Sequence, residues 1–388
     1  MTITTPSILR VAGIFFAGAL GSALPAQETA ALISRLSNES VDMRRDAAEL
    51  LGKSGAAAGA AVPALVAALK DSDVRVRANA AWALGKIQQQ PEQAVPALIE
   101  TFQDDDWTVR HNASLSITWL GKAAIPALEG ALQDKRERVR LYSSIALHRI
   151  DGSRAPAVVP VLEQLLGSDV SEIRFVAAQT VCAVGTPAAT TVPKLVALLK
   201  DKDAPVYLTA ISALGAVGEA ARPAVPELVK FVQPTHKSDV RIAAVTALGQ
   251  IGGDLHLWVP AATKMLGPTT SESVPAAAIR ALNKIGAKAV PYLVTALRDE
   301  DGTIREFAAE TLSLIGEPAA PAVPNLIDLL KDPRWEVRKR SANALGLIGV
   351  ADEKVLAALR AATRDSEEAV RSYAQSALAT LNQRKSRS

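Results

Sequence analysis

The apolar positions of this chain recur at a nearly constant interval. An apolar residue followed by proline appears at spacings of 30 to 34 residues, and an apolar residue followed by arginine keeps the same period. Because chance does not hold such a register, residues 27–381 divide into eleven repeats of about 33 residues. The prolines are Pro63, Pro96, Pro126, Pro160, Pro193, Pro226, Pro260, Pro291 and Pro324. The arginines are Arg44, Arg77, Arg110, Arg140, Arg174, Arg241, Arg305, Arg338 and Arg371.

Each repeat is predicted to form two helices. The first begins at the proline, whose fixed φ and missing N–H suit a first helical turn. The second, counted from the arginine, is apolar or small at −1, +3, +6, +7 and +10, which is a 3.6-residue stripe. Asp73, Asp106, Asp203 and Asp301 stand where a side-chain oxygen can cap it. A glycine at +11 can end it with positive φ, as at Gly55, Gly121, Gly185, Gly218, Gly252, Gly286, Gly316 and Gly349.

A helical pair of this size cannot bury its apolar stripe alone, whereas stacked pairs can. We therefore predict an all-α fold, an α-solenoid of about eleven helical pairs stacked into a right-handed superhelix. It forms one elongated domain over residues 27–381, followed by a basic, disordered tail at 382–388. Both end repeats lack the proline (Ala30 and Ala357 take its place), and such atypical ends favour a capped monomer.

The first 26 residues are predicted to be a secretory signal peptide. Residues 1–10 carry one basic and no acidic side chain, residues 11–20 are uncharged, and small residues follow. Cleavage is expected after Ala26, with Ala23 as the second choice and a buried first helix as the alternative interpretation. Ten apolar residues are too few to cross a hydrocarbon core of about 30 Å. The protein is thus expected to be exported, periplasmic or secreted, without a stable membrane span.

Composition and charge limit the chemistry. Lys and Arg total 43 against 40 Asp and Glu, a net charge of +3 that is too balanced for a protein that grips nucleic acid. The single Cys182 cannot form an internal disulfide, and as a small thiol in a packed helix it is not expected to be a nucleophile. The four histidines show no metal-ligand spacing, and no nucleophile or phosphate-loop motif appears. We expect no cofactor, no metal and no catalytic residues.

The pattern V-P-x-L-V-x-x-L-K-D-x-D-x-x-V-R-x-x-A-A-x-A-L-G resembles the HEAT-repeat superfamily. It is most similar to the branch of phycocyanobilin-lyase HEAT-like repeats, with the best matches at residues 69–87 and 329–349. The resemblance covers residues 27–381 and implies the armadillo-type solenoid fold. It says little about function, because such repeats serve in scaffolds, adaptors and a few enzymes.

The arginines pair naturally with an acid six residues earlier, and the resemblance implies a ladder of such contacts linking successive repeats. An arginine fork accepts a carboxylate through two parallel hydrogen bonds. A structural ladder is favoured over a basic stripe for an anionic partner, because acids recur with bases. Repeat eight loses both members (Thr269, Pro275), whereas repeat six keeps Asp201 but has Tyr207. The ladder residues are Arg77, Arg110, Arg140, Arg174, Arg241, Arg305, Arg338, Arg371, Asp71, Asp104, Asp134, Asp299, Asp332 and Asp365.

Positions +2, +5 and +9 of the second helices vary most between repeats and share the face opposite the apolar stripe. In HEAT-like solenoids the second helices line the concave surface, so these residues form a candidate binding groove. In repeats two to four they are Asn79, Trp82, Lys86, Asn112, Leu115, Trp119, Tyr142, Ile145 and Arg149. Such a cluster resembles an interaction hot spot. The alternative is that the large side chains fill space between neighbouring helices.

A weaker patch in the last repeats holds Phe307, Leu314, Arg340, Leu347 and Tyr373, and Trp107 and Trp335 are expected to pack at repeat edges. The leading hypothesis is a non-catalytic exported scaffold or adaptor that binds a protein or peptide on the concave face. The alternative, from the resemblance alone, is a lyase or binding protein for a bilin tetrapyrrole, with Trp82, Trp119, Tyr142 and Arg149 around the pigment. A purely structural role is the third.

Overall fold

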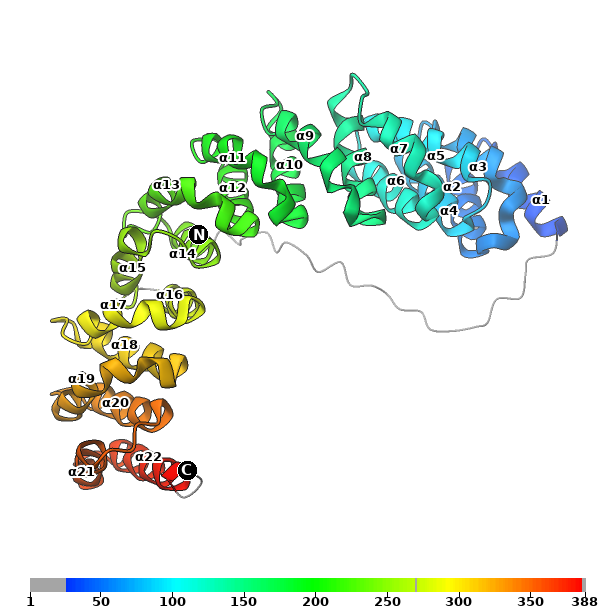
Figure 1. Ribbon diagram of the computed structural model, residues 1–388. Helices are drawn as coiled ribbons and strands as arrows, with labels where there is room; N and C mark the ends of the chain where they lie inside the picture. Colours follow the sequence, from blue (N-terminus) through cyan, green and yellow to red (C-terminus); the bar gives the residue numbers. More distant parts are fainter. Residues whose placement is uncertain (1–25, 269–270, 386–388) are drawn as a thin grey trace, which may run out of the picture. The chain divides into compact units, whose positions relative to one another are not determined.

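The structure is a computed structural model that describes residues 26–268 and 271–385 of the chain. Every regular element in these residues is helical (Figure 1), and the predicted all-α solenoid is confirmed. Contacts divide the chain into a first unit, Met1–Ala127, and a second unit, Leu128–Ser388, each of which is described by itself. The predicted signal segment lies outside the described residues except for Ala26, which begins the first helix.

The first unit alternates short and long helices, with short 3₁₀ helices labelled η. In chain order they are α1 (Ala26–Arg35), α2 (Val41–Lys53), η1 (Gly55–Ala61), α3 (Val62–Ala68), α4 (Val74–Ile87), α5 (Pro91–Glu100), η2 (Thr101–Gln103), α6 (Trp107–Leu120), η3 (Gly121–Ala124) and α7 (Ile125–Ala131), the last of which runs on past Ala127.

The second unit continues the alternation. Its helices are α8 (Glu137–Ile150), η4 (Gly152–Arg154), α9 (Ala155–Leu165), α10 (Ser171–Val184), η5 (Thr186–Thr191), α11 (Val192–Leu198), α12 (Ala204–Val217), η6 (Gly218–Ala224), α13 (Val225–Lys230), α14 (Ser238–Ile251), α15 (Leu255–Lys264), α16 (Ser273–Ile285), η7 (Gly286–Ala289), α17 (Val290–Ala296), α18 (Gly302–Ile315), η8 (Glu317–Ala322), α19 (Val323–Asp328), η9 (Leu329–Lys331), α20 (Trp335–Ile348), α21 (Glu353–Ala362) and α22 (Glu368–Lys385).

The local signals act as elementary helix chemistry requires. Prolines stand in the first turn of α3, α11, α13, α17 and α19, and all eight recurring glycines have positive φ. The expected start at the recurring proline is wrong for α5, α9 and α15, because these helices begin earlier and contain Pro96, Pro160 and Pro260 in their interior. Asp73 caps α4 by accepting the N–H groups of Arg75 and Val76. The expected cap at Asp203 is wrong, because Pro205 in the first turn of α12 has no N–H to donate.

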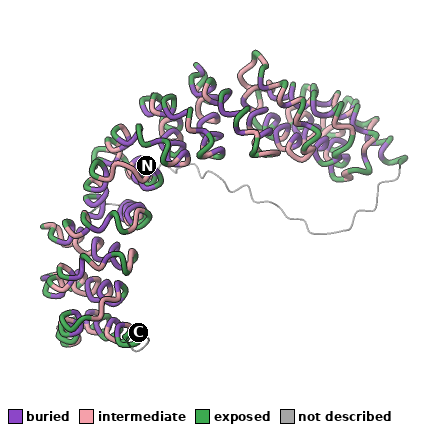
Figure 2. The backbone as a smooth tube through the Cα atoms, viewed as in Figure 1, coloured by how far each residue is buried: buried purple, intermediate pink, exposed green. Residues whose placement is uncertain are grey.

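Packing between neighbouring second helices needs small residues where they cross. A Cβ at Gly85 of α4 would overlap Ser116 of α6, and the Ser116 hydroxyl donates to the Ala81 carbonyl at 2.7 Å. The apolar stripe is fully buried, as at Val76 and Leu84. Figure 2 shows buried residues distributed along both units, because each repeat packs on its neighbours.

A ladder of arginine–aspartate pairs joins successive repeats. Arg77 Nε donates to Asp104 Oδ2 at 2.6 Å, and Arg77 Nη2 donates to Asp104 Oδ1 at 3.0 Å. In every such pair the acid lies 27 residues after the arginine, in the next repeat. The same two-pronged geometry occurs in Arg44–Asp71, Arg174–Asp201, Arg305–Asp332 and Arg338–Asp365.

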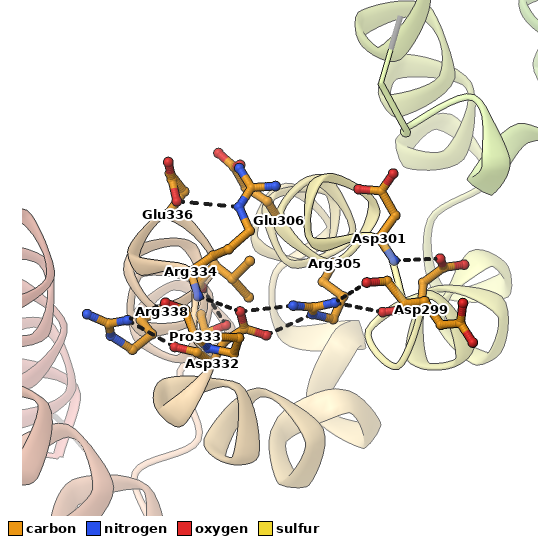
Figure 3. Close-up of polar contacts among 12 residues, drawn as sticks. Asp299, Asp301, Arg305, Glu306, Asp332, Pro333, Arg334, Glu336 and Arg338 are labelled. Atoms are coloured by element: carbon orange, nitrogen blue, oxygen red, sulfur yellow. Dashed lines mark hydrogen bonds and ion pairs between the residues drawn. The ribbon is translucent and has the colours of Figure 1, made fainter.

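Backbone carbonyls of the arginine's own repeat hold the third nitrogen of each fork. Arg305 Nη1 donates to the carbonyls of Asp299 at 2.8 Å and Glu300 at 2.9 Å, while its other nitrogens bind Asp332 (Figure 3). The Asp332 carbonyl in turn accepts from Arg338 Nη1 at 2.9 Å. Asp332, with only 4% of its side chain exposed, thereby binds the arginine of the preceding repeat through its carboxylate and the arginine of its own repeat through its carbonyl.

The direction of pairing differs from the one expected within each repeat. The acid six residues before an arginine offers that arginine its backbone carbonyl, as Asp71 does to Arg77 at 2.9 Å. The Asp71 carboxylate instead accepts from Arg44 of the preceding repeat. It also accepts the backbone N–H of Asp73 in the turn. Asp201, which the loss of arginine at Tyr207 left in question, is bound by Arg174, and this guanidinium lowers the pKa of the Asp201 carboxyl.

Other ladder positions make substitute contacts. Asp134 is bound by Arg136 Nη2 at 2.8 Å, and this guanidinium lowers the pKa of the Asp134 carboxyl to about 2. Asp299 accepts from Lys264 Nζ at 2.6 Å, and Arg241 Nε donates to the Val232 carbonyl. Arg110 and Arg371 each donate through Nη1 to two carbonyls of their own repeat. Thr269 lies outside the described residues.

The C-terminal boundary was predicted too early. Helix α22 continues to Lys385, so the expected disordered tail is wrong for residues 382–385, while 386–388 lie outside the described residues. Basic residues Arg384 and Lys385 in the last turn suit the partial negative charge at a helix end. Among the described residues, the stretch Ala204–Lys230 has the length and apolarity of a membrane span, but it comprises α12, η6 and α13, which contribute buried residues to the solenoid core.

We expect Asp332→Asn to destabilise the protein by about 2 kcal/mol, the usual worth of hydrogen bonds to a charged partner. The substitution removes the charge that receives both nitrogens of Arg305. Urea denaturation followed by circular dichroism measures the change. Glu300→Gln is the control, since Glu300 is an exposed acid in the same region that offers Arg305 only its carbonyl. Equal midpoints for both variants would show that the ladder does not stabilise this junction.

Candidate functional site

Two tryptophans and a lysine form the main feature of the candidate groove in the first unit. Trp82 and Lys86 lie on α4 at +5 and +9, and Trp119 lies on α6 at +9. Both indoles are half-buried and Lys86 is exposed. We call Trp82, Lys86 and Trp119 the tryptophan platform.

Trp82 is seated by a glycine on the preceding second helix. A Cβ built on Gly52 of α2 would overlap the six-membered ring of Trp82 and would also reach the Ala83 backbone. The ring therefore lies against α2, and only part of it meets solvent. The inner part of the Trp82 ring thus fills space between neighbouring helices, as the alternative interpretation of the groove holds. The outer part of the ring is exposed to solvent.

Lys86 joins the two indoles. Its Nζ lies 4.2 Å from the centroid of the Trp119 ring and 5.9 Å from that of the Trp82 ring, within cation–π range. The Trp119 backbone is held as well, because Gln88 Nε2 donates to its carbonyl at 2.6 Å. Gln88 has a positive φ and ends α4 where most second helices have glycine.

The two asparagines of the groove are engaged within the chain. Asn79 Nδ2 donates to the Arg45 carbonyl at 3.3 Å, and Asn112 Nδ2 donates to the Ala78 carbonyl at 3.0 Å. Each bond runs from one second helix to the backbone of the one before it. These side chains connect neighbouring repeats, and Leu115 beside them is half-buried.

The remaining groove residues lie on α8, in the second unit. Tyr142 and Ile145 are half-buried and Arg149 is exposed. The nine residues predicted as one groove are therefore found on two separately described parts, six on α4 and α6 and three on α8.

The patch predicted in the last repeats includes part of a hollow. Phe307 of α18 and Arg340 of α20 line a cavity of about 430 Å³, together with Pro275, Ile279 and Glu310, which the sequence reasoning missed. Arg340 Nη2 lies 3.2 Å from Glu310 Oε2. The other three members, Leu314, Leu347 and Tyr373, are 55%, 44% and 38% exposed.

Two tryptophans expected to pack at repeat edges are more exposed than predicted. Trp107 is 62% exposed and contacts His111, whose ring centroid lies 5.8 Å away. Trp335 is 37% exposed, with Lys339 Nζ 4.8 Å from its ring centroid.

Cys182 is the single thiol of the chain, and it lies in α10. Burial raises the pKa of the Cys182 thiol to about 11, which keeps it protonated and unreactive at neutral pH. Among the described residues no three His, Cys, Asp or Glu side chains are grouped to hold a metal ion.

Comparisons with known proteins agree with the repeat architecture. The sequence model described as HEAT repeats matches residues 29–118, 95–182, 160–249, 192–266, 259–323 and 321–379. No curated protein matches the chain. The match is to HEAT repeats in general, and the narrower resemblance to phycocyanobilin lyases stays a prediction.

Similar solved structures include two of Kap121p. The structure of Kap121p bound to Ste12p is 16% identical with a TM-score of 0.64, and covers 92% of this chain and 45% of Kap121p. The structure bound to RanGTP is 14% identical with a TM-score of 0.59, and covers 92% and 44%. The chain therefore spans less than half the length of these neighbours, and the likeness shows the fold alone.

We expect Gly52→Ala to lower the free energy of unfolding by about 1–3 kcal/mol, because the added methyl overpacks the contact with Trp82. Urea denaturation followed by tryptophan fluorescence measures both stability and the displacement of the ring. Gly130→Ala is the matched control, since no atom lies within 4 Å of a Cβ there and alanine favours the helix. A Gly52→Ala protein as stable as the control would contradict the close packing of the Trp82 ring against Gly52.

Proposed function

The chain belongs to the HEAT-repeat family, and on that premise we propose that it is a non-catalytic scaffold that holds a protein or peptide partner against its second helices. The observation that carries this proposal is the tryptophan platform. A half-buried indole supplies a large contact area near fixed polar groups, which is the composition typical of interface hot spots.

The platform is organised before any partner arrives. Trp82 lies against Gly52, and the Lys86 ammonium lies against the Trp119 ring, so both indoles have partners within the chain before binding and less side-chain freedom is left to lose. Lys86 stands beside both rings and still presents exposed N–H donors. A fitting partner segment places an apolar side chain on the indole surfaces and an acceptor or a carboxylate near Lys86.

The fold supports a binding role in a second way. Kap121p, a solenoid of similar fold, has been solved bound to Ste12p and to RanGTP, so such a stack can hold protein partners. A stacked solenoid presents a wide surface without ordering a segment on binding. No feature of the described residues favours the bilin-lyase alternative over this proposal.

The full chain, fixed on a support, tests the proposal when wild type is compared with a variant carrying Trp82→Ser and Trp119→Ser. We expect the wild type to retain a partner from the source cells, and the double variant to lose at least nine-tenths of it. Binding of the identified partner is then measured by titration, with circular dichroism to show that both proteins are folded. The free-energy loss expected for two hot-spot residues exceeds about 2 kcal/mol.

Trp335→Ser is the matched control, because it removes an exposed indole at a repeat edge that is not part of the platform. The control should bind as the wild type does. Equal binding by all three proteins would exclude the platform as the docking site, and no partner for any of them would contradict the scaffold function.

We also propose that the protein acts outside the cytoplasm. The support is the basic start, the uncharged run at residues 11–20 and the small residues that follow. When the full chain is expressed with a secretory pathway, the intact mass of the exported protein should correspond to a start at Gln27. An uncleaved chain confined to the cytoplasm would contradict this proposal and leave the binding proposal standing.

A further inference from the structure

At the junction between the fourth and fifth repeats, the ladder arginine remains and its acid is missing. Arg140 stands at the ladder position of the fourth repeat, and Ser168 takes the acid position of the fifth. The equivalence of Ser168 is visible in two bonds. Its Oγ accepts the Val170 N–H, as Asp201 Oδ1 accepts that of Asp203, and its carbonyl accepts from Arg174 Nη1 at 2.8 Å.

Arg140 is nevertheless oriented as a ladder arginine. Its Nη1 donates to the carbonyls of Asp134 at 2.8 Å and Lys135 at 3.1 Å, as Arg305 Nη1 does to its own repeat. Arg140 Nε is buried and has no acceptor, which holds for no other ladder arginine in the described part of the chain. The guanidinium edge that binds a carboxylate elsewhere is thus in place without its partner.

The nearest carboxylate is drawn away from this edge. Glu137 Oε2 accepts the Ser168 hydroxyl at 2.6 Å, which leaves Glu137 Oε1 at 3.9 Å from Arg140 Nη2. That separation is longer than a hydrogen bond. Ser168 therefore supplies no carboxylate to Arg140, and its hydroxyl binds the neighbouring carboxylate of Glu137.

A hollow of about 620 Å³ opens against Arg140, between α7 and α9. The two acids in its lining are already bound, Glu129 by Arg154 at 2.6 Å and Asp134 by Arg136 at 2.8 Å. The two cations in its lining, Arg140 and Lys135, have no carboxylate within hydrogen-bond distance among the described residues. The unsatisfied charge in the hollow is positive.

We propose that this hollow is a second binding site, which takes a carboxylate side chain of a partner protein onto Arg140. The incoming Asp or Glu supplies the acid that the fifth repeat lacks, with Lys135 beside it. The fork is held by the same backbone bonds as in the pairs Arg44–Asp71 and Arg305–Asp332, so little rearrangement of the arginine is required. The site lies on the first-helix side of the fourth and fifth repeats, and it does not involve the tryptophan platform.

Acetate is the probe, titrated into the full chain against sodium chloride at equal ionic strength. Two readouts are followed, the urea midpoint and the Nε–Hε signal of Arg140 in the nitrogen–proton correlation spectrum. We expect acetate to raise the midpoint beyond the chloride effect, since a ligand of the folded state stabilises it. The Arg140 signal should shift in a saturable way, and Arg140→Lys, which keeps the charge but loses the fork, should abolish the excess midpoint shift.

Ser168→Asp fills the position from within the chain. It should raise the urea midpoint without acetate, move the Arg140 signal toward those of Arg77 and Arg305, and remove the acetate response. Thr235→Asp is the matched control, because Thr235 holds the same repeat position opposite Tyr207, where no arginine stands. It should neither stabilise the protein nor change its response to acetate.

Equal acetate responses in wild type and Arg140→Lys would overturn the proposal, and so would a full response in Ser168→Asp. Because Arg140→Lys keeps the positive charge and removes only the fork, the comparison with wild type remains decisive if Ser168→Asp fails to fold. The platform variant with Trp82→Ser and Trp119→Ser should keep the acetate response, which separates this site from the proposed scaffold function.

Discussion

The rest of the structure depends on the two-pronged contact between an arginine of one repeat and an aspartate of the next. Two parallel hydrogen bonds determine both distance and orientation, so they set the register between consecutive turns as well as adding energy. The pairs are largely shielded from water, and shielded ion pairs stabilise only when their remaining donors are satisfied. The backbone carbonyls that hold Nη1 meet that condition, and Asp332, which receives Arg305 and offers its carbonyl to Arg338, shows how the junctions connect.

That register decides which side chains of the second helices meet water. Neighbouring helices approach so closely that only a small residue is tolerated at the crossing, as at Gly85 against Ser116. Large residues are excluded from the crossing and occupy the +2, +5 and +9 positions. An asparagine there reaches the backbone of the preceding helix, whereas an indole is too large to be covered and remains partly exposed. The tryptophan platform is therefore a consequence of the same spacing that builds the core.

The period of the sequence predicted the helical pairs, their prolines and their terminal glycines, because these are local signals that every repeat restates. The partner of each arginine was harder to predict, since an acid six residues earlier and an acid 27 residues later recur with equal regularity. In the structure, the acid six residues earlier offers the arginine its backbone carbonyl, and the acid 27 residues later offers its carboxylate. The periodicity predicted which helix face carries the groove residues, but not what each side chain does there. It does not show that Asn79 donates to the backbone of the preceding helix, or that the Trp82 ring packs against Gly52. The hollow beside Phe307 joins α16, α18 and α20, and no local pattern reports such a junction.

Departures from the repeat are of two physical kinds, and the difference bears on function. At the junction between Tyr207 and Thr235 both members of a pair are replaced, and a paired loss leaves no buried donor unsatisfied. At Arg140 only the acid is replaced, which leaves a shielded N–H without an acceptor, an arrangement that costs free energy. Asp299 has lost its ladder arginine and accepts a hydrogen bond from Lys264 instead. Arg241 has lost its ladder acid and donates to the Val232 carbonyl instead. Retention of the guanidinium at Arg140, oriented but without a hydrogen-bonded acid, is therefore not explained by packing, and an acid supplied from outside the chain would account for it.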